Sequence, residues 1–316
     1  MSGVRVTPDN FARAESDLYF GNIVKDGGFG RYFHVRELTP IDHQLVIRSN
    51  RDTLYSAAIF DLDAGPVTVT LPDAGERFLS MQVIDEDHHT AEVVYGAGEH
   101  TLAKEQIGTR YVATVVRILI DPDDPDDLPA VHALQDAIAV SQEDPGSFDV
   151  PNWDPVSQRT VRDALITLAT TLTDTRRAFG TKADTDPVRH LIGTANAWGG
   201  NPEKDALYLT VIPPANDGAT VHRLVVGEVP VDGFWSVTVY DKDGYFAPNP
   251  HNAYSYNNVT AQPGPDGTIA IQFGGCDGVT PNCLPITPGW NYTVRLYRPR
   301  REILDGTWTF PQAQPI

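Results

Sequence analysis

The spacing of hydrophobic and polar residues predicts a short helix at the start of the chain and β-structure after it. Thr7 can cap a helix, Pro8 suits its first position, and Phe11, Ala14 and Leu18 fall on one face. From Gln44 the pattern changes to short β-rich runs separated by turn clusters, which favours an antiparallel sandwich or barrel. The runs are QLVIRS, TLYSAAIFDLD, PVTVTLP, RFLSMQVID, AEVVYGA and TRYVATVVRILID.

A helical insert should follow the acidic loop DPDDPDDLP. One helix is expected over Pro129–Val140 and a second over Pro155–Phe179, with Asp154 as its cap and Gly180 as its stop. Asp186 can cap a third, shorter helix. The buried stripe of the second helix is predicted to be Val161, Leu165, Leu168 and Leu172.

The β pattern then returns in ALYLTVIPP, VHRLVVGEVP, GFWSVTVYD, TIAIQFGG and NYTVRLYRP. These shifts predict an N-terminal helical segment at 1–37, a first β-domain at 38–121, a helical insert at 122–200 and a second β-domain at 201–316. The predicted fold class is therefore mainly β, with two related β-domains.

The two β blocks share a signature that indicates an internal duplication. The first has DTLY from Asp52 followed by FLSMQVIDED, and the second has DALY from Asp205 followed by FWSVTVYDKD. An Asn precedes each copy, at Asn50 and Asn201. Each longer stretch is typical of a strand that ends in an acidic turn, with Asp-x-Asp capping the turn through hydrogen bonds to the backbone.

Composition narrows the possible partners. The 316 residues carry a formal charge of −18 and no visible cluster of Lys and Arg, which excludes a typical nucleic-acid-binding protein and disfavours anionic membranes. No run is long and apolar enough to span a membrane, and the first residues show no apolar signal core, so a cytoplasmic location is expected. Cys276 and Cys283 lie in a short loop and could form a disulfide, but two ordinary thiols are favoured.

The chain resembles two families of unknown function. The stretch NRDTLYSAAIFDLDAGPVTVTLPD with RFLSMQVIDED is similar to domain of unknown function 1254. The C-terminal part, from GFWSVTVYDKDGYF to DGTWTFPQAQPI, is similar to its usual partner, domain of unknown function 1214. The resemblance implies two β-sandwich-like, jelly-roll-type domains and a homo-oligomer, and it implies no activity. The chain departs from the common pattern at Ala253, where many relatives have Arg, and at Cys283, where many have Trp.

The first candidate site is the stretch IRSNRDTLYS, which places cations, an amide, a carboxylate and a phenol within eight positions. Arg48, Asn50, Arg51, Asp52 and Tyr55 could bind a carboxylate or a polyol. The alternative is a polar strand entry stabilised by contacts such as Arg51 with Asp52.

The second candidate is the turn DEDHHT, where Asp85 or His88 could act in acid–base chemistry. Its side chains could also be offered to a metal, but adjacent His88 and His89 would point to opposite faces of a strand, so an exposed acidic turn is favoured and no metal is assigned.

The third candidate is an aromatic cluster around the second Asp-x-Asp turn, which could bind a sugar or a flat organic ligand or could simply pack in a core. It includes Trp235, Tyr240, Asp241 and Tyr254.

Two hypotheses follow from these candidates. The protein is a small-molecule enzyme in which Asp52, Asp85 or His88 is the acid or base, or it is a non-catalytic binding or scaffold protein with the same pocket. No cofactor is assigned. The sequence lacks G-x-S-x-G, G-x-G-x-x-G and P-loop motifs, which excludes the hydrolases and nucleotide-binding proteins that depend on them.

Overall fold

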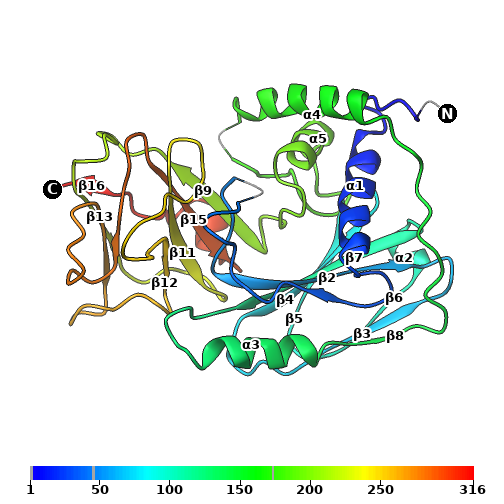
Figure 1. Ribbon diagram of the computed structural model, residues 1–316, viewed down its shortest axis with the longest axis horizontal. Coiled ribbons are helices and arrows are strands. Elements are labelled where there is room, and N and C mark those ends of the chain that lie inside the picture. The colour runs from blue at the N-terminus through cyan, green and yellow to red at the C-terminus, as the bar shows by residue number, and fades with distance from the viewer. Residues whose placement is uncertain (1–2, 45–46, 173) are drawn as a thin grey trace. The chain divides into compact units, whose positions relative to one another are not determined.

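The computed structural model describes residues 3–44, 47–172 and 174–316. The chain forms two compact units that each combine separate segments. Unit 1 comprises residues 1–36, 54–119 and 128–203, and unit 2 comprises residues 37–53, 120–127 and 204–316. Most of the expected helical insert thus belongs to the same unit as the first β block. The fold is mainly β with several antiparallel sheets, as the sequence predicts (Figure 1).

Unit 1 contains a five-stranded sheet in the order β1-β2-β7-β4-β5 and a three-stranded sheet in the order β6-β3-β8. The strands are β1 (Phe33–His34), β2 (Thr53–Asp61), β3 (Val67–Leu71), β4 (Leu79–Asp85), β5 (Thr90–Tyr95), β6 (Gly98–Leu102), β7 (Tyr111–Leu119) and β8 (Ala139–Ser141). Strand β7 is buried along its whole length, which explains why its apolar run is nearly continuous.

The helices of unit 1 are α1 (Phe11–Lys25), α2 (Lys104–Ile107), α3 (Asp127–Asp136), α4 (Pro155–Ala169) and α5 (Pro187–Asn196). Phe20 of α1 packs against Ile59 and Tyr111 of the sheet, while Phe11 joins Leu165 and Ile192 in a second cluster that ties α1 to α4 and α5. Asp154 and Asp186 cap α4 and α5 as predicted, because each side chain accepts hydrogen bonds from the first turn.

Several details of the predicted elements are wrong. The first helix begins at Phe11 with Asn10 as its cap, so neither Thr7 nor Pro8 has its predicted role, and Leu18 is exposed. The second helix ends at Ala169, and Leu168 is half-exposed because the buried side of α4 is narrower than its apolar stripe. In the predicted strand at 44–49, residues 45 and 46 lie outside the described residues, and 47–48 form a turn.

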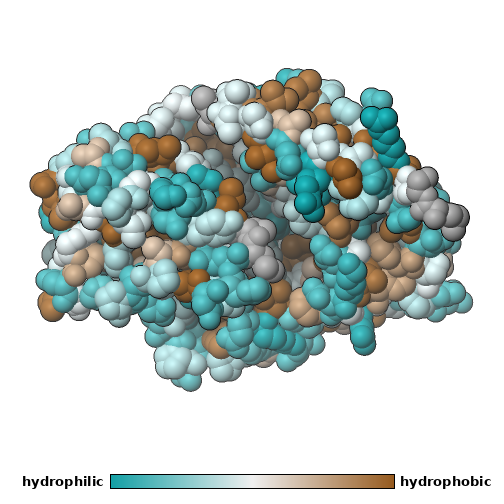
Figure 2. All heavy atoms as spheres, turned by 45° about the horizontal axis from the view of Figure 1, so that its top comes forward, coloured by the Kyte–Doolittle hydropathy of each residue, from teal (hydrophilic) through white to brown (hydrophobic). Residues whose placement is uncertain are grey.

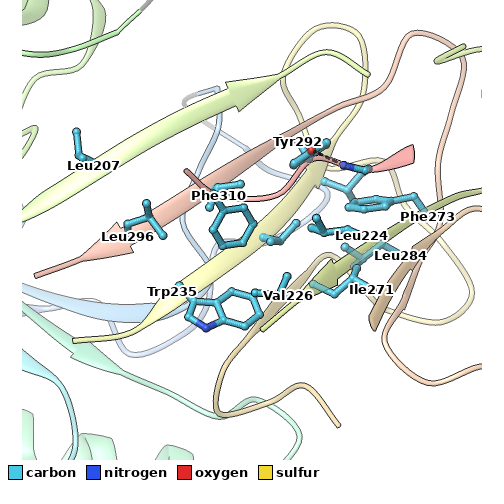
Figure 3. Close-up of a cluster of buried hydrophobic side chains, with 14 of the residues drawn as sticks. Leu207, Leu224, Val226, Trp235, Ile271, Phe273, Leu284, Tyr292, Leu296 and Phe310 are labelled. Carbon is cyan, nitrogen blue, oxygen red and sulfur yellow. Dashed lines mark hydrogen bonds between the residues drawn. The ribbon is translucent and has the colours of Figure 1, made fainter. Parts of the chain in front are cut away.

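Unit 2 is a sandwich of two four-stranded sheets, ordered β12-β11-β15-β9 and β14-β13-β10-β16. Its elements are β9 (Ala206–Val211), β10 (His222–Val226), β11 (Trp235–Tyr240), β12 (Ser255–Asn257), β13 (Ile269–Phe273), β14 (Cys283–Leu284), β15 (Asn291–Tyr297), α6 (Arg301–Leu304) and β16 (Gln314–Pro315). Side chains from both sheets form one buried cluster (Figure 3), which also includes Phe310 of the C-terminal tail, and Trp308 packs against it.

The predicted internal duplication is confirmed in the sheets and in the turns. The order β2-β7-β4-β5 of unit 1 matches the order β9-β15-β11-β12 of unit 2. Asp85 Oδ1 accepts the backbone N–H groups of Asp87 and His89 at 2.9 and 2.8 Å, and Asp241 Oδ1 accepts those of the equivalent residues Asp243 and Tyr245 at 2.9 Å each. The cap therefore forms the same turn twice.

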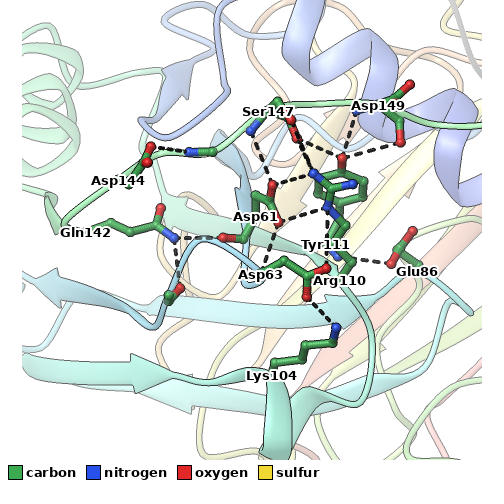
Figure 4. Close-up of polar contacts among 12 residues, drawn as sticks. Asp61, Asp63, Glu86, Lys104, Arg110, Tyr111, Gln142, Asp144, Ser147 and Asp149 are labelled. Carbon is green, nitrogen blue, oxygen red and sulfur yellow. Dashed lines mark hydrogen bonds and ion pairs between the residues drawn. The ribbon is translucent and has the colours of Figure 1, made fainter.

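An ion pair with a buried carboxylate fixes a long connection in unit 1 (Figure 4). Arg110 binds both oxygens of the buried Asp61, at 3.0 and 2.7 Å, and Asp61 also accepts the N–H of Ser147 at 3.2 Å. Burial raises the pKa of Asp61, but the bonds from Arg110 and Ser147 outweigh that effect and hold the pKa below its usual value. Because every partner is a neighbouring chain segment, we assign this network a structural role.

Hydrophilic residues make up most of the face shown in Figure 2, with hydrophobic residues in smaller groups among them, which fits the strongly acidic composition. In the described part of the chain, no helix has the length and apolar character needed to cross a membrane.

Candidate functional site

The sheet β12-β11-β15-β9 of unit 2 has a polar face opposite its hydrophobic core. Side chains alternate along a strand, so every second residue of β11 and β15 enters the core and the others lie on the second face. On β11, β15 and β12 that face is polar yet almost fully buried, apart from a partly exposed Ser255, whereas on β9 it carries the partly exposed Tyr208 and the exposed Thr210. It carries Ser236, Thr238, Tyr240, Thr293, Arg295, Ser255 and Asn257.

Arg295 is the charged centre of this face and is 3% exposed. Its Nη1 donates to the Thr238 hydroxyl at 2.8 Å, and its Nη2 donates to the Arg48 carbonyl and the Tyr240 hydroxyl at 2.8 Å each. The Tyr240 hydroxyl in turn donates to the Ser49 carbonyl at 2.7 Å. Arg295 thus holds the segment that leads to Asp52.

Burial lowers the pKa of Arg295, but the neighbouring Tyr240 and Asp52 outweigh burial and raise it, so the guanidinium stays charged. The pKa of Tyr240 is raised, chiefly by burial, so its hydroxyl keeps its proton and remains a donor.

Asp52 is held in a fixed position next to this face and is 2% exposed. Its backbone N–H donates to the Asn50 side chain at 2.8 Å, and its carbonyl accepts from Ile120 at 3.0 Å. The Ser255 hydroxyl donates to Asp52 Oδ1 at 2.9 Å. The other oxygen, Oδ2, is buried and has no hydrogen-bond partner among the described residues. A buried carboxylate oxygen is normally paired with a hydrogen-bond donor, because leaving it unpaired costs free energy.

A pocket of about 100 Å³ opens beside Asp52, and all of its walls belong to unit 2. The Asn249 side chain fixes the loop that lines the pocket, because it accepts hydrogen bonds from the N–H groups of His251 and Ala253 at 3.1 and 3.2 Å. The lining residues are Arg51, Asp52, Pro122, Asp123, His251, Asn252, Ala253, Tyr254, Ser255, Tyr256, Asn257 and Thr260.

Two aromatic rings hold the cation of this pocket. The Arg51 guanidinium lies 5.3 Å from the centre of the Tyr254 ring and 5.9 Å from that of Phe246, and it donates to the Thr39 carbonyl. Burial lowers the pKa of Arg51. Tyr254 and the Arg51–Asp52 pair come from two predicted candidate sites that the fold brings together.

The other predicted residues of unit 2 do not line the pocket. Asn50 donates to the Tyr297 hydroxyl at 3.2 Å, and Arg48 Nη2 reaches Asn291 Oδ1 at 3.5 Å. Trp235 packs in the hydrophobic core, and Asp241 caps the second acidic turn. These contacts position the chain.

Tyr55, Asp85 and His88 belong to unit 1. The Arg117 guanidinium lies 5.6 Å from the centre of the Tyr55 ring. His88 is 2% exposed, and both of its ring nitrogens are engaged: Nδ1 with the Thr194 hydroxyl and Nε2 as acceptor from the Gly199 N–H, each at 2.8 Å. Burial lowers the pKa of His88 well below its usual value, so the ring is neutral and holds the structure together.

The effect of burial on the pKa of a carboxyl group in unit 1 can be tested at Asp85. Burial raises the pKa of Asp85 from 3.8 to about 7, so the folded state binds its proton more tightly than the unfolded chain. Its contribution to stability is fully present below pH 3.8 and is lost as the pH rises toward 7. Asp85→Asn keeps the Oδ1 acceptor, and we expect it to stabilise the protein by about 1–2 kcal/mol at pH 8, since partial solvent access screens the charge.

The measurement is urea unfolding of the wild type and of Asp85→Asn between pH 4 and pH 8. The difference between them should grow with pH up to about 7 and then stay constant. Asp243→Asn, at an exposed carboxylate, is the control for loss of a surface charge. A difference that does not change with pH would show that Asp85 ionises alike in both states.

Sequence reasoning missed Arg295, His251, Asp123 and Ser255. The sequence did contain a signal for Arg295. The stretches VVRIL at 115–119 and TVRLY at 293–297 resemble each other and belong to the two copies of the duplicated unit. Arg117 lies opposite Ser80, and Arg295 lies opposite the equivalent Ser236. No group of three or more His, Cys, Asp or Glu among the described residues is placed to hold a metal ion.

Two models of known protein families match the chain. Residues 29–105 match DUF1254 and residues 214–301 match DUF1214, each described as a protein of unknown function. The chain is a two-domain DUF1254/DUF1214 protein. A comparison with curated proteins found no match.

Solved structures of two uncharacterised proteins share the fold of this DUF1254/DUF1214 protein. The VPA0106 protein from Vibrio parahaemolyticus has a TM-score of 0.71 at 17% identity, with 97% of each chain covered. A putative uncharacterized protein from Burkholderia cenocepacia has a TM-score of 0.55 at 12% identity, with 97% of this chain and 86% of that chain covered. At these identities the likeness concerns the fold alone.

Proposed function

We propose that unit 2 binds a small hydroxylated molecule, such as a hydroxy acid or a polyol, and that Asp52 acts on its hydroxyl group as a hydrogen-bond acceptor and general base. The observation that carries the proposal is the buried Oδ2 of Asp52, which lacks a partner among the described residues while its residue lines a pocket. A ligand hydroxyl would satisfy that oxygen.

The size and charge of the pocket support a small ligand. A volume of about 100 Å³ corresponds to roughly three water molecules, which suits a molecule of about three to six non-hydrogen atoms. Arg51 offers a cation for a carboxylate, and Tyr254 gives it a fixed place. Ala253, one of the positions that departs from the usual pattern, also lines the pocket. Its small side chain leaves Arg51 as the cation among the pocket's lining residues.

The test is a thermal-shift screen of small hydroxy acids and polyols against the wild type and Asp52→Asn. Wild-type protein should gain stability with at least one compound, whereas Asp52→Asn should lose affinity for it by about tenfold or more because the amide cannot accept the same charge-assisted hydrogen bond. Asp243→Asn, which changes an exposed carboxylate paired with Lys242, should bind like the wild type.

Incubating each bound compound with the protein and following its NMR spectrum then separates an enzyme from a binding protein. Conversion by the wild type but not by Asp52→Asn supports catalysis. Binding without conversion supports the alternative, a non-catalytic small-molecule-binding protein. Equal binding by the wild type and Asp52→Asn would contradict the proposed site.

A further inference from the structure

We infer that a chain of hydroxyl groups from Arg295 through Thr238 and Ser255 to Asp52 makes this pocket selective for ligands that donate a hydrogen bond. The inference rests on the proposed function and deepens it, because it names the residues that leave Asp52 as an acceptor and so decide which ligand groups the site takes. Thr238, Ser255 and Arg295 are then positioning residues, which act through Asp52.

The distances form an unbroken chain. Arg295 Nη1 lies 2.8 Å from the Thr238 hydroxyl, that hydroxyl lies 2.9 Å from the Ser255 hydroxyl, and Ser255 lies 2.9 Å from Asp52 Oδ1. Thr238 and Ser255 are direct partners across β11 and β12, so the register of the sheet fixes their separation. Thr238 and Arg295 are fully or almost fully buried.

Chemistry fixes the direction of every hydrogen bond in the chain. A guanidinium can only donate, so the Thr238 oxygen accepts from Arg295. Asp52 Oδ1 accepts from the Ser255 hydroxyl, which uses the single proton of that hydroxyl. The contact between the two hydroxyls is therefore donated by Thr238 to Ser255. The positive charge of Arg295 thus polarises both hydroxyls toward the carboxylate.

With these hydrogen-bond directions, the second carboxylate oxygen of Asp52 can serve a ligand only as an acceptor. Oδ1 is occupied by Ser255, so the oxygen of Asp52 that remains for a ligand is Oδ2, which is an acceptor without a partner among the described residues. An ether, a halide or a second carboxylate would bring an acceptor to an acceptor and leave both unsatisfied in a buried place. A hydroxyl or an ammonium group supplies the missing proton.

The experiment uses two probes of similar size, glycolate and fluoroacetate, which differ in whether the group next to the carboxylate can donate. Ligand-observed NMR titration should show that the wild type prefers glycolate by about fivefold or more. Thr238→Val keeps the volume and removes the hydroxyl, and it should reduce the affinity for glycolate about tenfold. Thr238→Ser restores the hydroxyl and should restore the affinity.

Thermal unfolding without ligand shows whether each variant is folded, and Ser255→Ala breaks the chain at a partly exposed residue if Thr238→Val is unstable. Equal affinity for the two probes, or glycolate affinity that survives both Thr238→Val and Ser255→Ala, overturns the inference. If neither probe binds the wild type while another compound of the screen does, the same comparison is made with that compound and its deoxy analogue.

A readout without ligand separates this inference from the proposed function. Thr238 is fully buried, so its hydroxyl proton should exchange slowly and should be visible by NMR with a contact to Ser255. If it is visible and no compound binds, the chain exists and the proposed function fails. If it is absent, the chain itself is wrong.

Discussion

Arg295→Met should lower the free energy of unfolding by about 3–5 kcal/mol, the largest effect we expect from a single substitution. Arg295 is 3% exposed and donates to the Thr238 hydroxyl, the Tyr240 hydroxyl and the carbonyl of Arg48. Methionine fills a similar volume but leaves these acceptors buried with fewer donors, and each unsatisfied group costs about 1–3 kcal/mol. It also removes a charge that faces Asp52.

Urea unfolding followed by tryptophan fluorescence measures this loss. Arg295→Lys should recover only part of it, because one ammonium group cannot reproduce the planar fork that reaches acceptors on β11 and on the segment before Asp52. The matched control is Arg300→Met, where a half-exposed arginine pairs with half-exposed Asp232 at 2.7 Å. That variant should lose far less stability, because an exposed ion pair contributes little in water. Equal losses at the two positions would contradict a central role for Arg295.

The duplication could be predicted from the sequence, because it depends on hydrogen bonds between residues that are close together in the chain. A strand followed by Asp-x-Asp forms the same turn in both units, since the first carboxylate accepts two backbone N–H groups each time. The fourth turn residue differs, His88 in one copy and Gly244 in the other, and both adopt a positive φ, of 66° and 88°. The turn therefore sets the backbone and leaves the side chain free to vary.

The predicted helical faces failed where tertiary packing decides burial. Leu18 and Leu168 match the helical period, but each lies on a side of its helix that no other element covers completely. Periodicity predicts on which face of a helix a side chain lies, but it does not predict how completely other elements bury that face. Short edge strands such as β12 and β14 were missed because two or three residues carry too little pattern.

Half of the candidate site could be predicted from sequence. The dense polar stretch around Arg51 and Asp52 and the aromatic cluster with Tyr254 were both found, but about two hundred positions separate them, and only the fold shows that they share a pocket. The polar face of the sheet escaped prediction for a different reason. Alternating polar residues in a strand normally indicate a solvent-facing side, and here Thr238 and Arg295 are buried.

The disulfide corrects the prediction that favoured two ordinary thiols. Cys276 and Cys283 are bonded, and the bridge holds the short strand β14 next to β13, where Leu284 enters the core. Disulfides are typical of proteins that fold in oxidising compartments, so a cytoplasmic location remains a prediction that this bond does not favour.

Removing the bridge should lower the free energy of unfolding by about 2–3 kcal/mol, because an unfolded chain closed over this short loop loses less entropy on folding. The native loop has its own support, since Asp277 accepts the N–H groups of Val279 and Thr280 at 2.9 and 2.7 Å. These bonds lower the pKa of Asp277 to about 2, so they persist at neutral pH. We therefore expect the folded loop to keep its shape and the loss to arise mainly in the unfolded state.

Calorimetry with and without a reducing agent measures this effect in the wild type. The double variant Cys276→Ala with Cys283→Ala should unfold at the temperature of the reduced wild type, to within the small cost of trimming the buried Cys283. The same variant should not respond to the reducing agent, which makes it the control for effects of that agent elsewhere. If reduction leaves the unfolding temperature of the wild type unchanged, the bridge does not stabilise this sandwich, and β14 is held by Leu284 and its pairing with β13 alone.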